Sequence, residues 1–300
     1  MTKNHTAVNG ADRCSLCRKD KNWVNDRFKD DKSRIIPVHH SKVLLADHDK
    51  EPEAVFLKNK DILESSGLVD SLVFLGIYDK ISYFVVDIKS DEFALSLSKK
   101  VDGSFKSIRW IVSLLSRRDC ELLTLARFMI YWHSRNQYCG KCGSKTISTD
   151  AGHVRICKNQ ACKESYFPSM DPAVIVLVSL GEKCLFGRQK AWPNEMYSTL
   201  AGFVEPGETI EDAVAREIQE EVGISVDNVK YQGSQPWLFP SSLMLGFTAS
   251  AKEEIITIDK TELEDARWFT REEIKKNPEM LPGKVSIAYK LITDWMGKEG

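Results

Sequence analysis

The densest chemical pattern in this chain of 300 residues lies between Gly202 and Ile224, which read GFVEPGETIEDAVAREIQEEVGI. Pro206-Gly207 predicts a tight turn, and Gly223 predicts the end of a helix that begins near residue 208. The apolar positions of this helix recur at helical spacing, as expected for a face packed on a core: Ile210, Ala213 and Val214.

Three glutamates continue the same face towards the end of the helix. At about 100° per residue, Glu217, Glu220 and Glu221 lie within an arc of about 100°. Like charges repel there, and the carboxyl end of a helix disfavours anions. A divalent cation reverses these effects, and hard oxygen ligands suit Mg²⁺ or Mn²⁺. We therefore expect a catalytic metal site in which Arg216 positions a carboxylate; the alternative is a solvated acidic face, which would also expose the apolar positions.

The spacing Gly-x5-Glu-x7-Arg-Glu-Ile-x-Glu-Glu-x-Gly-Ile resembles the signature of the Nudix hydrolases at every defined position. This resemblance implies an α/β fold, the Nudix α/β/α sandwich, and the hydrolysis of nucleoside diphosphates linked to another moiety. It implies that the three glutamates are catalytic and bind Mg²⁺ or Mn²⁺, with structural roles for Gly202, Arg216 and Gly223. The carbonyl of Ala201 and the carboxylate of Glu262 would complete the metal ligands. The alternative for Glu262 is an ordinary surface acid.

A second stretch, Ser234–Ser242 (SQPWLFPSS), resembles the signature of the NADH pyrophosphatase subfamily of the Nudix hydrolases. Leu238 stands where that signature usually has proline. The resemblance implies aromatic stacking on the substrate bases, hydrogen bonds to the dinucleotide and a backbone contact near the last helix. The residues it suggests are Phe167, Phe203, Trp237, Gln235, Ser242, Glu262 and Ala288. For the three aromatic residues, ordinary core packing remains the alternative.

The cysteines predict a structural zinc site. Cys139-x2-Cys142 and Cys157-x4-Cys162 supply two close pairs, and four thiolates leave no open position for water. Reduced thiols without metal are the alternative. A ribbon of this kind just before the catalytic domain also fits the resemblance. Cys14-x2-Cys17 has no matching second pair, and His39, His40 and His48 fall in a region that we interpret as ordinary strand and loop.

The composition restricts the class of protein. The chain is 42% hydrophobic and 28% charged, and 42 basic against 43 acidic residues give a net charge of −1, so no global basic field recruits a polyanion. The longest apolar run, Ala173–Val178, is too short for a membrane helix, and the first twenty residues lack the pattern of a secretory signal. We expect a cytoplasmic protein that does not enter membranes.

Changes in pattern along the chain, together with the resemblance described above, predict four parts. These are a polar, loosely ordered lead-in (1–35), a β-rich N-terminal domain with a helical linker (36–135), a zinc ribbon (136–169) and a Nudix hydrolase domain (170–298). The linker is expected to be helical over 105–137, and a terminal helix is expected near residues 288–295. Strands are expected at 43–45, 55–57, 72–77, 83–88, 173–179, 183–187, 243–250, 254–258 and 266–269.

From the resemblance we predict a homodimer that cleaves the pyrophosphate of NADH or NAD to nicotinamide mononucleotide and AMP. NAD-capped RNA is a second expected substrate, for which the ribbon offers a local basic patch of Lys141, Lys145, Arg155 and Lys158. One alternative is a Nudix hydrolase of another nucleoside diphosphate derivative. The other is an inactive binding module, in which we expect one of the three helix glutamates to be lost.

Overall fold

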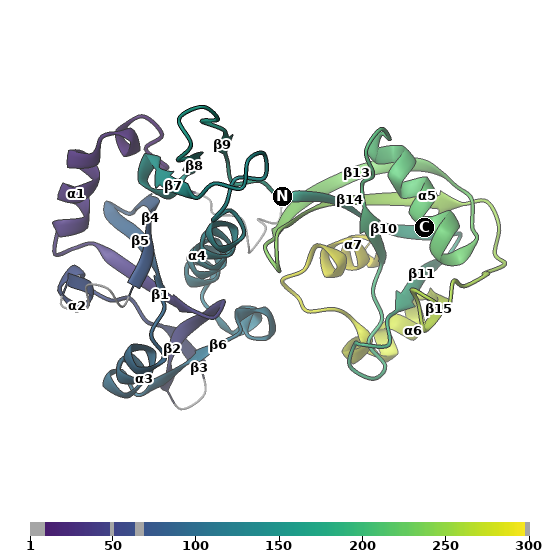
Figure 1. Cartoon of the computed structure of the whole chain (residues 1–300). Coiled ribbons are helices and arrows are strands. Elements are labelled where there is room, and N and C mark those ends of the chain that lie inside the picture. Colours follow the sequence, from purple (N-terminus) through teal and green to yellow (C-terminus); the bar gives the residue numbers. More distant parts are fainter. Residues whose placement is uncertain (1–9, 49–50, 64–68, 298–300) are drawn as a thin grey trace. The chain divides into compact units, whose positions relative to one another are not determined.

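A computed structural model describes residues 10–48, 51–63 and 69–297 of the chain. The chain forms two compact units (Figure 1). Of the described residues, one unit contains Met170–Trp237 and those from Ser241 onward, and the other contains those from Gly10 to Ser169 together with Leu238–Pro240. None of the described helices combines the length and the apolar character needed to cross a membrane.

A mixed sheet forms the centre of the C-terminal unit. Its strands follow the order β13-β14-β10-β11-β15, and β12 pairs with β10. Strands β10 and β14 are parallel, whereas the other pairs are antiparallel. The bounds are β10 Asp171–Leu180, β11 Lys183–Arg188, β12 Leu200–Phe203, β13 Val226–Trp237, β14 Ser242–Ala251 and β15 Asp265–Thr270.

Helices cover both faces of this sheet (Figure 1). Successive side chains of a strand point to opposite faces, so β10 contributes to two cores. Val174 and Val176 pack in the cluster that contains α5 (Ile210–Val222), and Ile175 and Leu177 pack in the cluster that contains α7 (Ile287–Met296). The short helix α6 spans Arg271–Lys276. The predicted α/β/α sandwich is confirmed.

The N-terminal unit contains a second mixed sheet, with strand order β3-β2-β1-β5-β4 and β6 paired to β2. Strands β1 and β5 are parallel, and Phe74, Phe84 and Ile35 lie in the core beneath them. The predicted β-rich N-terminal domain is confirmed. Its elements are α1 Lys21–Lys29, β1 Arg34–His39, β2 Lys42–His48, β3 Glu51–Ala54, α2 Asn59–Leu63, β4 Val69–Tyr78, β5 Ile81–Ile88, α3 Asp91–Lys100, β6 Gly103–Lys106 and α4 Arg117–Arg135.

Three short strands follow α4 and form the predicted ribbon. Strand β7 (Thr146–Thr149) pairs with β8 (Val154–Cys157), which pairs with β9 (Ser165–Tyr166). This sheet is too small to bury a core of its own. The four cysteines that gather beside it are described below with the site.

Several local expectations differ from the structure. The lead-in contains helix α1, whose first turn is capped by the side chain of Asp20 and which buries Phe28. Strand β1 was not predicted from the sequence. The expected strand at 55–57 is reduced to one β-bridge, between Leu57 and Ile35. The region 105–137 begins with β6 and two 3₁₀ turns before α4. No strand forms at 254–258, because backbone donors of this loop bond the end of α5, as described below.

Candidate active site and zinc ribbon

Both ends of the glutamate helix α5 are fixed by local hydrogen bonds. The Thr209 side chain accepts from the backbone N–H of Asp212, and the Asp212 carboxylate accepts from the N–H of Thr209, which completes a capping box. At the other end Gly223 has φ +69°, a left-handed conformation in which glycine is favoured. The predicted helix and its stop are therefore present, and the glutamates occupy its last two turns.

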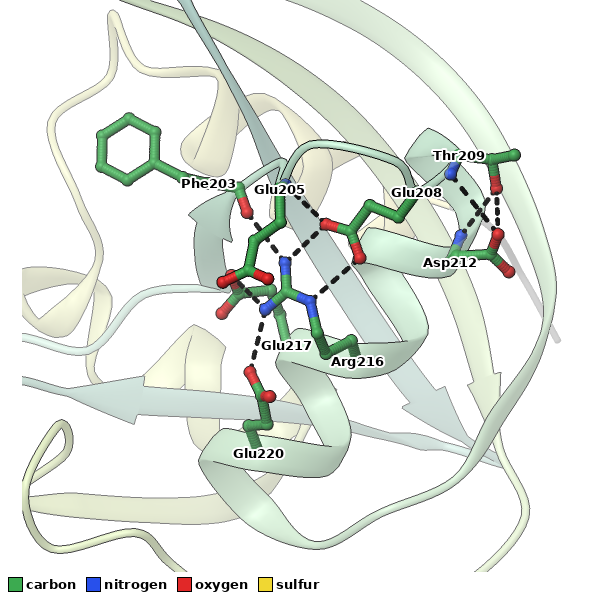
Figure 2. A network of polar contacts seen from close by, with 8 residues as sticks. All are labelled: Phe203, Glu205, Glu208, Thr209, Asp212, Arg216, Glu217 and Glu220. Carbon is green, nitrogen blue, oxygen red and sulfur yellow. Dashed lines mark hydrogen bonds and ion pairs between the residues drawn. The ribbon is translucent and has the colours of Figure 1, made fainter.

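Arg216 is the centre of a polar network that joins α5 to the turn before it (Figure 2). Its guanidinium donates to both carboxylate oxygens of Glu208, at 2.7 and 3.0 Å, and to the carbonyl of Phe203 at 2.9 Å. It also donates to Glu217 at 3.0 Å and to Glu220 at 2.8 Å. The two hydrogen bonds that Glu208 accepts from Arg216 lower the pKa of Glu208 to about 2. Arg216 thus orients two of the predicted glutamates and the strand end next to them.

Glu217, Glu221 and Glu262 come together beside α5, with one carboxylate oxygen of each within 4.8 Å of the others. Burial raises the pKa of Glu217. Burial, reinforced by the charges of Glu217 and Glu262, raises the pKa of Glu221 to about 8. Glu221 is 4% exposed, and its Oε2 has no hydrogen-bond partner among the described residues. A buried carboxylate oxygen without a partner beside two further acids is the arrangement that a divalent cation satisfies, so these residues fit Mg²⁺ or Mn²⁺.

Two further residues predicted at this site lie beside it in different ways. The Glu220 side chain is 57% exposed, and its carboxylate bonds Arg216 rather than joining the group of three acids. Ala201 lies on β12 next to Gly202. A Cβ atom added at Gly202 would meet the Glu217 carboxylate at 1.8 to 2.1 Å. Glycine is therefore required at 202 so that Glu217 can lie against the strand. The roles of Glu220 and Ala201 as metal ligands stay predictions.

The loop that carries Glu262 is attached to the end of α5. The N–H groups of Thr257 and Asp259 donate to the carbonyls of Val222 and Glu221, at 2.8 and 2.9 Å, and so satisfy acceptors that a helix leaves free at its end. The Asp259 carboxylate then accepts from the N–H and the hydroxyl of Thr261. Sequence reasoning missed Asp259; the pattern Asp-x-Thr, typical of a side-chain turn, could have indicated it.

The predicted substrate contacts are distributed over several elements. Phe203 is 59% exposed at the end of β12, which leaves its ring accessible rather than packed in the core. Trp237 is half-buried at the end of β13 and pairs in register with the buried Ser242 of β14. Phe167, in the other unit, is 63% exposed. Core packing is thus ruled out for Phe203 and Phe167 within their own units, and their contacts with substrate stay predictions.

Gln235 has a structural role that the sequence did not indicate. Its side chain is fully buried, donates to the carbonyl of Val285 at 2.8 Å and accepts from the N–H of Ile287 at 2.6 Å. These bonds hold the start of α7, where the predicted Ala288 is itself buried. In this structure Gln235 supports the segment expected to contact substrate through its backbone, while the predicted direct bond from Gln235 to the dinucleotide is untested.

The four ribbon cysteines gather with their sulfur atoms within 4.8 Å of one another. The Sγ atoms of Cys142 and Cys157 are 3.4 Å apart, and those of Cys139 and Cys162 are 3.8 Å apart. For Zn–S bonds of about 2.3 Å, a tetrahedron has edges of about 3.8 Å, so the sulfur atoms fit zinc. The Tyr166 hydroxyl donates to Cys139 and lowers the pKa of that thiol. The geometry supports the predicted structural zinc site.

One member of the predicted basic patch on the ribbon is not available. Arg155 is buried, and its guanidinium donates to the Thr146 hydroxyl and to Nδ1 of His133, both at 2.8 Å. It ties β8 to α4 and cannot meet an RNA phosphate, so its inclusion in the patch was wrong. Lys145 and Lys158 are exposed, and Lys141 is paired with Glu164.

Comparisons with protein families agree with this domain order. The NUDIX domain family matches residues 170–291, which contain the sandwich and the glutamate helix, and so defines the class of the catalytic unit. The NADH pyrophosphatase zinc ribbon domain matches residues 134–167, and the NADH pyrophosphatase-like rudimentary NUDIX domain matches residues 32–132. The chain belongs to the Nudix hydrolase family, and within it to the NADH pyrophosphatase type that these three domains together define.

Three relatives illustrate the similarity. The human NAD(P)H pyrophosphatase NUDT13, named as mitochondrial, is 36% identical over 244 residues, which are 73% of this chain and 69% of its own length. The human NAD-capped RNA hydrolase NUDT12 is 43% identical over 61% of this chain and 43% of its own length. The Arabidopsis thaliana Nudix hydrolase 19, named as chloroplastic, is 40% identical over 72% of this chain and 53% of its own. The chain thus spans about half the length of the latter two.

Proposed function

We propose that this protein hydrolyses the pyrophosphate bond of NADH or NAD, giving nicotinamide mononucleotide and AMP. The observation that carries this proposal is the group of Glu217, Glu221 and Glu262, with a buried carboxylate oxygen that lacks a partner among the described residues. The name of the relative NUDT13, an NAD(P)H pyrophosphatase, supports the choice of substrate. A nucleotide-binding module without catalysis would have no need of two buried glutamates beside a third carboxylate.

The chain's own residues have distinct parts in this reaction. Glu217 and Glu221, with Glu262 from the neighbouring loop, would hold Mg²⁺ or Mn²⁺ through carboxylate oxygens. When bound, such a cation neutralises the pyrophosphate charge and lowers the pKa of an attacking water. Arg216 keeps Glu217 oriented, and Gly202 lets its carboxylate approach β12. Without the cation, the carboxylates of the three acids repel one another, and a bound cation would offset this repulsion. We therefore expect hydrolysis of the substrate to depend on the cation.

The exposed ring of Phe203 is proposed to stack on one base of the dinucleotide. It stands directly beside the network, because the Phe203 carbonyl accepts from Arg216. A flat, accessible aromatic ring next to an acidic metal site suits a substrate with a heteroaromatic ring at each end of a pyrophosphate. Trp237, Ser242 and Phe167 are proposed to add further contacts, and a homodimer and a cytoplasmic location are proposed on the family resemblance and the composition alone.

The direct test is a product assay. The purified full chain is incubated with NADH and millimolar Mg²⁺ or Mn²⁺, and the products are separated by chromatography. We expect reduced nicotinamide mononucleotide and AMP in equal amounts, and no products when EDTA is present. Cleavage of a nucleoside triphosphate or a sugar nucleotide, with NADH left intact, would identify the other expected kind of Nudix substrate. Sedimentation of an active monomer would remove the dimer from the proposal.

NAD-capped RNA is the second substrate that we propose, because the relative NUDT12 is named as an NAD-capped RNA hydrolase. It presents the same pyrophosphate with an RNA strand attached, and the strand adds phosphates for lysines to neutralise. Of the predicted patch, Lys145 and Lys158 are exposed. Two lysines contribute little to the affinity for the RNA strand, and their contribution is sensitive to salt. Raising NaCl should slow cleavage of capped RNA more steeply than cleavage of NADH, and equal salt dependence would exclude a role for these lysines.

A further inference from the structure

Two histidines and an aspartate meet at one edge of the N-terminal sheet. Parallel strands end at the same edge of a sheet, and β1 and β5 are parallel with Val38 opposite Asp87. The residues that follow these positions, His39 and the turn leading to Asp91, therefore lie side by side although they are distant in sequence. Nε2 of His39 is 3.0 Å and Nε2 of His40 is 3.2 Å from the same oxygen, Oδ1 of Asp91.

The hydrogen bonds of His39 determine which of its nitrogens faces the aspartate. Nδ1 of His39 lies 2.9 Å from the carbonyl of Ile88, which can only accept, so this nitrogen carries a proton. In the neutral ring, Nε2 then presents a lone pair to the Asp91 carboxylate. Two acceptors at 3.0 Å repel unless a positive charge lies between them, either a second proton on the ring or a bound cation. A carbonyl bonded to the far nitrogen is also the usual support for a metal-binding histidine.

His39 is held in place by its surroundings, whereas the side chains of His40 and Asp91 are 73% and 84% exposed. The His39 side chain is 12% exposed and its ring packs edge-on against Phe105 at 5.5 Å. His40 and Ser41 form the two-residue turn between β1 and β2, with φ of +47° and +61°. Asn-Gly is favoured at such a turn, and histidine is among the residues that tolerate the left-handed conformation, so the turn can present the His40 imidazole beside Asp91. Asp91 begins α3, directly after the capping residue Ser90.

We propose that His39, His40 and Asp91 form a binding site for a divalent cation of the zinc class. Tetrahedral zinc with bonds of about 2.0 to 2.1 Å has ligands about 3.3 Å apart, close to the two distances observed here. The histidine nitrogens lie within 4.8 Å of each other, and the 73% exposed side chain of His40 can rotate to close that gap. Two imidazoles and one carboxylate suit Zn²⁺ better than Mg²⁺, and they leave a position for water or an outside ligand.

Zinc titration of the full chain tests the proposal. The ribbon is first loaded and its zinc counted by elemental analysis; excess Mg²⁺ competes at the glutamate site, and any zinc that binds there contributes equally to every variant compared. Calorimetry with Zn²⁺ alone as the probe should then show one further site per chain with micromolar or tighter affinity. Asp91→Asn and His40→Asn should each weaken it at least tenfold. Asparagine is chosen at 40 because it tolerates the left-handed turn.

The matched control is Glu92→Gln, the same loss of charge at the next exposed position of α3, which should bind zinc like the wild type. Binding of NADH and its hydrolysis are not part of the readout, so the result is independent of the proposed function. If no further site is found, or if the two variants bind zinc as well as the control does, the three residues are only a hydrogen-bonded group and the proposal is overturned.

Discussion

The carbonyl of Glu221 accepts a hydrogen bond of 2.9 Å from the backbone N–H of Asp259. This bond connects the last turn of the glutamate helix to a loop that sequence patterns describe poorly. Three residues later the same loop supplies Glu262, and Leu263 then enters the core beside α5. The third acid of the site is thus positioned by the end of the helix that carries the first two.

The Asp259 side chain should matter for activity although it is not one of the three acids that gather at the site. Asp259→Ala removes the acceptor for Thr261 and loosens the turn that presents Glu262, so kcat/KM for NADH should fall by about tenfold, with a higher requirement for Mg²⁺. Asp259→Asn keeps an acceptor and should remain near wild type. Equal losses in both variants would show that charge, not the turn, is what counts.

Removing the charge of Glu221 should separate activity from stability. Glu221→Gln keeps the size of the side chain but removes a buried carboxylate, so turnover should fall on the order of a hundredfold or more. Without metal, the variant should be more stable than wild type by on the order of 1 kcal/mol, because the wild-type acid is buried beside like charges. Glu211→Gln, at an exposed position of α5, is the control for both assays, and near-normal turnover of Glu221→Gln would refute the role.

A methyl group at position 202 should displace Glu217. Gly202→Ala places a Cβ atom at 1.8 Å from the carboxyl carbon of Glu217, which forces the side chain or the strand to move. We expect a large loss of NADH hydrolysis and a lower melting temperature. Gly283→Ala, whose added Cβ meets no described atom within 4 Å, should be harmless. Wild-type kinetics for Gly202→Ala would mean that hydrolysis does not require the position of the Glu217 carboxylate against β12.

The ribbon cysteines should hold about one zinc ion per chain and stabilise the fold through it. Cys142→Ser should lower both the zinc content, measured by elemental analysis, and the midpoint of thermal unfolding. Cys17→Ser changes an exposed thiol outside the group of four and should leave both unchanged. Unchanged stoichiometric zinc in Cys142→Ser would contradict the assignment.

Acid should destabilise the N-terminal unit through His153. Burial lowers the pKa of His153 to about 4, and its Nε2 lies 2.7 Å from the Phe74 carbonyl. Between about pH 6.5 and 4 the unfolded chain binds a proton that the folded one does not, so stability falls as pH falls. The loss approaches about 3 kcal/mol at pH 4, since one pKa unit is worth about 1.4 kcal/mol. Urea unfolding of His153→Gln should show a flatter dependence on pH over this range, and an unchanged slope would assign the acid sensitivity to other groups.

The sequence contains enough to predict the elements whose patterns are local. Helix α5 shows this best, because its apolar stripe, its capping residues and Gly223 all lie within one continuous stretch. The cysteine pairs are equally local. The β10 run was also evident, since a strand buried on both faces is apolar throughout.

Features made by contacts between distant segments could not be predicted in the same way. The loop after β14 looks like a strand because residues 255–258 are all β-branched, but backbone donors at Thr257 and Asp259 bond the end of α5 instead. Arg155 looks like a surface cation until β8 pairs against β7 and places it over Thr146 and His133. His40 and Asp91 are 51 residues apart, and only the parallel pairing of β1 with β5 brings them together.

The two sheets follow the same plan. In each, a central parallel pair (β1 with β5, β10 with β14) is extended by a hairpin partner on either side, β2 and β4 in one and β11 and β13 in the other. The pairings of β4 and β13 even share register shifts. Residues 32–132, which contain the first of these sheets, match a family described as a rudimentary NUDIX domain, and the shared strand plan agrees with that description. The strand plan alone therefore does not make a hydrolytic site: among the described residues, the group of three glutamates lies only in the C-terminal unit, beside the sheet that α5 covers.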